Sequence, residues 1–214
     1  MGGFADFWAQ SDLVGRAVAL LLLAMSVSAW ALILWKTWLL RRARRGLVRA
    51  VPAFWGAAGV NEGRDALQSF DTEGLLLPLL DAATAETRSA TLDAAGKRES
   101  RLTRRLRDAL HAVLAKLQFG QVLLASVGAT APFVGLFGTV WGIYHALGSI
   151  SAAGNITIEK ISGPVGEALI MTAAGLAVAI PAVLAYNVFG KLVAACEADL
   201  EGFAHDLREL LDHD

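Results

Sequence analysis

The sequence predicts an all-α integral membrane protein with three transmembrane helices, the second and third of which are long and extend into the cytoplasm. Its 214 residues are 55% hydrophobic and have a mean hydropathy of +0.50, which is too apolar for an ordinary soluble domain. The apolar residues also gather into three long stretches separated by polar blocks. The net charge of −1 conceals a basic middle and an acidic end, so the total says little about binding partners.

The first apolar stretch runs from Ala17 to Trp35, between Arg16 and Lys36, and has about the length that a helix needs to cross a bilayer. The segment before it is acidic and no small-residue cleavage site follows it, so we expect a retained anchor rather than a signal peptide. Three tryptophans at its inner end suit an interfacial belt: Trp30, Trp35 and Trp38.

The second and third stretches extend from Val122 to Ile150 and from Pro164 to Gly190. Glu167 is the only charged residue between Ile161 and Gly190, and it follows an expected helix break at Gly163 and Pro164. An ionisable group at membrane depth costs about 2.5 to 3.5 kcal/mol, so it usually lines a polar pathway. The alternative is a carboxylate near the end of the span that reaches the interface.

Leucines recur at helical spacing from Leu102 to Leu117 with no glycine or proline among them, so we expect one long helix that leads into the second stretch. The same period continues from Leu192 to Leu210 after the third stretch. Pro52 to Gly59 indicate a turn, and Pro78 indicates the start or interruption of a further helix.

The basic residues predict the orientation in the membrane. Most lie between the first two spans, at Lys36, Arg41, Arg42, Arg44, Arg45, Arg49, Lys97, Arg98, Arg101, Arg104, Arg105, Arg107 and Lys116, against only Arg16 and Lys160 on the opposite side. By the positive-inside rule the middle segment and the C-terminus are cytoplasmic. The predicted order is a periplasmic N-terminus (1–16), transmembrane helix (17–38), cytoplasmic helical region (39–118), transmembrane helix (119–150), periplasmic loop (151–162), transmembrane helix (163–190) and cytoplasmic C-terminal helix (191–214).

Two pairs of polar residues are expected at matching depths in the second and third spans. Counting inward at about 1.5 Å per residue places Thr139 and Thr172 about 15 Å from the outer face. The same count brings His145 and Glu167 close to each other nearer the outside, which permits an imidazole–carboxyl pair. The threonines are equally compatible with a structural role, each bonding its own helix, and His145 with a helix–helix contact.

Small residues predict that these helices pack closely with partners on more than one side. They are Gly135, Gly138 and Gly142 in the second span and Ala168, Ala173, Ala174, Gly175, Ala177, Ala179, Ala182 and Ala185 in the third. Pro132 and Pro181 each free a backbone carbonyl within a span, which protein or water must satisfy. A multi-helix assembly around a polar interior is more plausible than a lone three-helix monomer.

No phosphate-binding glycine loop, metal-ligand spacing or nucleophile constellation occurs in the sequence. We therefore expect no enzymatic activity, no cofactor, no metal site and no nucleic-acid partner. The one cysteine, Cys196, excludes an internal disulfide and is expected to be a buried thiol.

The segment from Ala131 to Ile143, with Gly166 to Ala173 and Ala179 to Asn187, closely resembles the ExbB/TolQ proton-channel family, which is related to the flagellar stator MotA. The resemblance implies a homopentamer in the bacterial inner membrane, surrounded by membrane lipids, that encloses the helices of an ExbD or TolR partner and energises TonB or TolA. It also implies that Thr139, Glu167 and Thr172 line the channel around an aspartate of the partner, and that Asn187 has functional weight.

Within the family, the Asp12 entry to the first span and the Tyr186 to Phe189 exit favour ExbB, whereas His145 is more similar to TolQ. A four-span stator fits three spans less well. A passive scaffold, in which Glu167 only holds helices together, stays open as an alternative.

Overall fold

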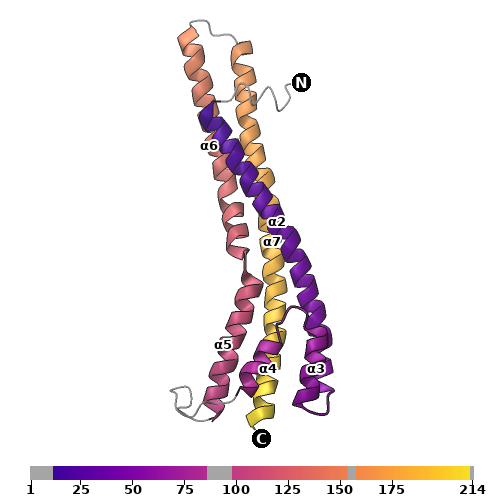
Figure 1. The fold of residues 1–214 in the computed structure, drawn as a ribbon. Coiled ribbons are helices and arrows are strands. Elements are labelled where there is room, and N and C mark those ends of the chain that lie inside the picture. The colour runs from indigo at the N-terminus through magenta and orange to yellow at the C-terminus, as the bar shows by residue number, and fades with distance from the viewer. Residues whose placement is uncertain (1–11, 86–97, 154–157, 213–214) are drawn as a thin grey trace. The chain divides into compact units, whose positions relative to one another are not determined.

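A computed structural model describes residues 12–85, 98–153 and 158–212. Every regular element in these ranges is a helix, in the order α2 (Leu13–Trp55), α3 (Val60–Phe70), α4 (Leu77–Thr84), α5 (Arg98–Gln118), α6 (Gln121–Ala153) and α7 (Ile158–Asp212) (Figure 1). Three stretches are long and apolar enough to cross a membrane, in α2, in α5 with α6, and in α7. The predicted fold class, an all-α protein with three membrane-spanning helices, is confirmed.

The chain forms two compact units. The first contains residues 1–34 and 120–187, and the second contains residues 35–119 and 188–214. The first unit holds most of the apolar stretches of α2, α6 and α7, and the second holds α3, α4, α5 and the C-terminal parts of α2 and α7.

In the first unit, α6 and α7 are in backbone contact along a seam of glycines. A Cβ atom added to Gly135 would lie 2.5 Å from the carbonyl oxygen of Met171, and one added to Gly175 would lie 2.6 Å from that of Ala131. On α6, Gly138 is also close to α2, since its Cβ would lie 2.9 Å from a methyl group of Val18. The close packing that the small residues predict is therefore present, and α6 contacts both of its neighbours.

Two helix boundaries differ from the sequence expectation. The expected continuous helix through Leu117 is interrupted by a turn at Phe119 and Gly120, because Gly120 adopts a left-handed conformation with φ of 79° that ends α5. The expected break at Gly163 and Pro164 is absent, since α7 begins at Ile158 and continues through both residues. The predicted loop between the spans falls partly on residues 154–157, which lie outside the described ranges.

The second unit is organised around buried groups that fix its short helices. The buried Asp71 carboxylate accepts hydrogen bonds from the backbone N–H groups of Leu75, Leu76 and Leu77, at 2.8, 2.7 and 2.9 Å. These are donors that a helix start leaves free, so Asp71 fixes where α4 begins. A turn follows α2 at Trp55, as the glycines predict, although Pro52 lies inside α2 rather than in the turn. Pro78 lies in the first turn of α4, as expected.

Candidate functional site

Thr139 of α6 and Thr172 of α7 meet at the contact between these helices. Their hydroxyl oxygens are 2.5 Å apart, which agrees with the similar depth expected for them and adds a direct contact that the depth count did not predict. The Thr139 hydroxyl is buried, with 6% of the residue exposed, and also lies 3.1 Å from the carbonyl oxygen of Gly135 and 3.0 Å from that of Ala168. Thr172 is only partly buried, so it is the member of the pair nearer to a surface of this unit.

A count of hydrogens shows what the pair can do. Thr139 has one hydroxyl hydrogen and three acceptors within reach. In the first arrangement the Thr139 hydroxyl donates its hydrogen to a backbone carbonyl oxygen and accepts a hydrogen bond from the Thr172 hydroxyl. In the second arrangement the Thr139 hydroxyl donates to the Thr172 oxygen, which leaves the hydrogen of Thr172 free for a further acceptor. Both orders are available because the carbonyls of Gly135 and Ala168 lie inside helices and already accept backbone N–H groups.

The close approach of the hydroxyls depends on the glycine seam. Gly135 is one helical turn from Thr139 on α6. Any side chain at this position would press against the backbone of Met171 and Gly175 on α7. Gly142 lies almost one turn beyond Thr139 on α6 and faces Ala168. A Cβ atom added to Gly142 would lie 3.0 Å from the Cβ atom of Ala168. The hydroxyls therefore meet because the residues on both sides of Thr139 have no side-chain bulk.

The structure says less about the other predicted site residues, Glu167 and Asn187. Glu167 lies in α7, one turn before Met171, but its side chain is outside what the structure describes. Its pairing with His145 therefore stays a prediction. Asn187 lies on α7 with an exposed side chain.

At the start of α2, Asp12 connects this helix to α6. Its Oδ1 accepts the backbone N–H of Gly15 at 2.8 Å, which caps the helix, and its Oδ2 accepts the indole N–H of Trp141 at 2.6 Å. The Nδ1 atom of His145 lies 4.0 Å from the same Oδ2. In the described ranges, the carboxylate within ion-pair distance of His145 is thus that of Asp12.

The environment of Asp12 favours its charged form. Burial alone would raise the pKa of this carboxyl, but the hydrogen bond from Trp141, that from Gly15 and the nearby His145 together lower it below its ordinary value. The charged Asp12 carboxylate therefore suits its two hydrogen bonds, which cap α2 and connect it to α6.

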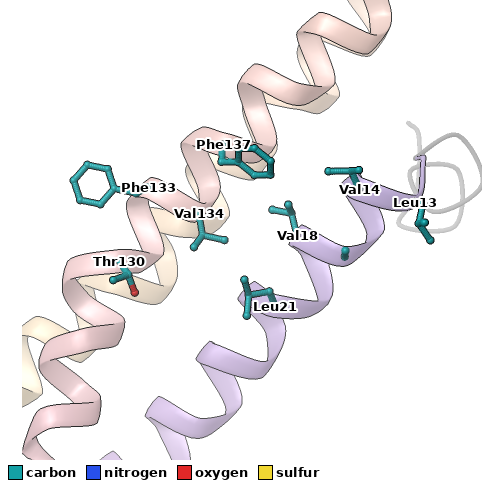
Figure 2. Close-up of a pocket in the computed structure, with 9 residues that line it drawn as sticks. Leu13, Val14, Val18, Leu21, Thr130, Phe133, Val134 and Phe137 are labelled. Carbon is teal, nitrogen blue, oxygen red and sulfur yellow. The ribbon is translucent and has the colours of Figure 1, made fainter.

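A groove of about 550 Å³ separates α2 from α6 in the first unit. In Figure 2, Val14, Val18 and Leu21 extend from α2 towards α6, and Val134 and Phe137 extend from α6. The only polar lining residue is Thr130, whose hydroxyl already bonds the carbonyl oxygen of Ser126 at 2.7 Å. None of the residues that line the groove carries a titratable side chain.

Sequence reasoning missed two polar contacts between helices, those of Asp12 and Lys36. An aspartate directly before an apolar span is a helix-cap signal, so the capping role of Asp12 could have been found, although its bond to Trp141 could not. Lys36 was counted only as a flanking charge, yet its side chain is completely buried. No local signal distinguishes it from the arginines that follow it.

The fold and the site together define a membrane protein whose helix contact carries uncharged hydroxyls. A model of the MotA/TolQ/ExbB proton channel family matches residues 76–202. The chain belongs to this family of membrane proton-channel transport proteins.

Curated relatives cover nearly the whole chain. "Biopolymer transport protein ExbB" of Xanthomonas campestris pv. campestris (strain B100) is 41% identical over 97% of this chain and 82% of that protein. The protein of the same name from Neisseria meningitidis serogroup A is 38% identical over 92% of both chains. "Tol-Pal system protein TolQ" of Haemophilus influenzae is 29% identical over 97% of this chain and 93% of its own length.

Proposed function

We propose that this chain is a ring-forming subunit of an inner-membrane motor of the ExbB type, driven by the proton-motive force. It would work with an ExbD-like single-span partner and energise TonB-dependent import across the outer membrane. Relatives named ExbB at 41% and 38% identity support this branch over TolQ at 29%. The role is transport rather than enzymatic catalysis.

The TolQ branch is the second candidate, because among the more distant relatives sequence identity hardly distinguishes ExbB proteins from TolQ proteins. The ExbB of Salmonella typhimurium is 31% identical over 96% of this chain, close to the value for TolQ. The histidine at position 145 is also more similar to the TolQ sequence pattern than to that of ExbB. Complementation decides between them: an ExbB-type subunit restores siderophore-dependent growth to a strain without ExbB, and a TolQ-type subunit restores envelope integrity to a strain without TolQ.

The contact that carries the mechanism is the 2.5 Å approach of the Thr139 and Thr172 hydroxyls. In the proposed mechanism the partner's membrane carboxylate holds the proton, and the two hydroxyls pass hydrogen bonds along a water chain without ionising. Glu167 would lie on the same pathway. A proton crossing 100 mV releases only about 2.3 kcal/mol, so movement of the partner proceeds in several small steps.

The small residues support an assembly of several copies, and we propose a pentamer that encloses the partner's helices. The arginines after the first span support a periplasmic N-terminus and a cytoplasmic C-terminus in a multi-pass inner-membrane protein. A passive scaffold is the competing interpretation. It would use the same close helix contacts but would not need the hydroxyl hydrogens.

The test is to remove the hydroxyls without changing side-chain volume. Thr139→Val and Thr172→Val are expected to reduce siderophore-dependent growth strongly while native mass measurement shows an unchanged oligomer. Glu167→Gln is expected to behave in the same way. Thr130→Val is the matched control, because its hydroxyl bonds only within its own helix turn, at Ser126.

Each outcome has a distinct meaning. Growth that equals the Thr130→Val control would remove the threonines from the proton pathway. Loss of the oligomer in step with loss of growth would show that the hydroxyls serve packing, as a passive scaffold requires.

A further inference from the structure

Lys36 of α2 is a completely buried lysine in the second unit, with 0% of the residue exposed. Its Nζ atom donates hydrogen bonds to the backbone carbonyl oxygens of Leu117 and Phe119, at 2.8 and 2.7 Å. In the described ranges no carboxylate lies within ion-pair distance of it. Lysines are almost never fully buried unless they are paired, so these carbonyls must account for its position.

The Leu117 carbonyl lies in the last turn of α5, and the Phe119 carbonyl lies in the turn directly after it. The last carbonyl groups of a helix have no backbone partner and form the negative end of its dipole. The nearby backbone hydrogen bond from Phe119 N goes to Lys116 O, at 3.4 Å, and does not use the carbonyl of Leu117 or Phe119. The ammonium group of Lys36 therefore supplies both donors and positive charge where α5 ends.

A simple interfacial anchor would look different. A lysine at the end of a transmembrane span usually extends its ammonium group to water or lipid headgroups. The arginines that follow, Arg41 and Arg45, are exposed in this way. Lys36 instead turns into the protein beside Trp35, whose ring packs edge-on against Phe119 with centroids 5.8 Å apart.

We propose that Lys36 is a positioning residue that caps α5 in trans and fixes the point at which the second membrane span begins. It acts through the carbonyls of Leu117 and Phe119, and the chain that follows them forms α6, which carries Thr139. A cap supplied from another helix holds the end of α5 only while α2 is in place. The link to proton transport rests on the proposed function, but the capping role does not.

The test compares Lys36→Met, which keeps the length and loses the donors, with Lys36→Arg, which keeps donors and charge. Backbone hydrogen exchange is measured on the full-length protein purified in lipid nanodiscs. In Lys36→Met the amides of residues 114–118 are expected to exchange at least about tenfold faster, because the last turn of α5 frays. Lys36→Arg is expected to recover at least half of the lost protection on a logarithmic scale.

Asp71→Ala is the matched control in the same unit. It removes a buried cap from α4 rather than from α5, so exchange is expected to rise over residues 75–80 and not over 114–118. Lys36→Met is expected to give the opposite pattern. Siderophore-dependent growth at equal membrane content is measured in parallel and is expected to fall in Lys36→Met and return in Lys36→Arg.

Unchanged exchange over residues 114–118 in Lys36→Met would overturn the cap, and so would an equal rise over both segments. If Lys36→Met does not accumulate in the membrane, the test of the cap falls on Lys36→Arg, which keeps hydrogen-bond donors and positive charge. Failure of Lys36→Arg to accumulate as well would show that donors and charge are not what the site requires. Local fraying with normal growth would overturn the link to transport alone. A wild-type chain that supports no growth would refute the proposed function and leave the exchange result standing.

Discussion

Gly135→Ala tests whether the α6–α7 seam sets the distance between the two hydroxyls. The added methyl carbon would lie 2.5 Å from the Met171 carbonyl oxygen and 3.1 Å from the Cα of Gly175. A relaxed contact between carbon and oxygen needs about 3.4 Å. The helices must therefore separate locally by about 1 Å, because the opposing atoms are backbone and cannot rotate away.

The cost follows from that displacement. Overpacking of a close contact destabilises by about 1 to 3 kcal/mol, and a backbone clash belongs near the upper value. Alanine offsets about 1 kcal/mol through its better helix propensity, so we expect a net loss of about 2 kcal/mol. The same separation would lengthen the Thr139–Thr172 distance from 2.5 Å to about 3.5 Å, beyond a normal hydrogen bond.

The assay measures thermal unfolding of the purified complex and siderophore-dependent growth at matched expression. Gly135→Ala is expected to lower both. Gly148→Ala is the control on the same helix, because its Cβ would meet nothing within 4 Å and it is expected to leave both unchanged or slightly raise stability. If the two variants behave alike, the seam does not set the hydroxyl distance and this reasoning is refuted.

Two further predictions concern ionisable groups outside the spans. Burial and Asp199 raise the pKa of the Cys196 thiol, against a smaller lowering by Arg44, so maleimide labelling at pH 7 is expected to be slow in the folded protein and complete after denaturation; fast native labelling would contradict its burial. Because the pKa of Asp12 is lowered, its contact with Trp141 contributes fully to folding at neutral pH and is lost as the pH falls below about 4. Asp12→Asn is therefore expected to lower the unfolding temperature at pH 7 and to have a progressively smaller effect as the pH falls below about 4, and an effect that does not diminish with falling pH would argue against the charged contact.

The helices and the similar depth of the two threonines could be predicted from the sequence because both follow from periodicity and length. Apolar stretches of membrane length predict spans, and antiparallel spans joined by a short connection align by counting, which placed Thr139 and Thr172 at similar depth. Counting gives depth but not rotation, so the contact itself needed the glycine positions that bring α6 against α7.

What could not be predicted depends on partners distant in sequence. The turn that ends α5 rests on the conformation of Gly120, which lies just beyond the leucine pattern. Lys36 lies more than 80 residues before the carbonyls that it bonds. The sequence around it does not differ from that of any basic residue next to a membrane span. Contacts of this kind need the tertiary structure, because each local pattern is satisfied without them.

The Thr139–Thr172 pair has a consequence for the directionality of the proposed motor. The two orders of hydrogen donation differ by rotation of two hydroxyl groups, which moves the hydrogen of Thr139 between a carbonyl oxygen and Thr172 and frees or engages the hydrogen of Thr172. Neither order needs a charged group, so in the proposed mechanism the pair supplies hydrogen bonds without itself storing a proton. The direction of the proposed motor would then be set by the partner that moves and by the sign of the gradient.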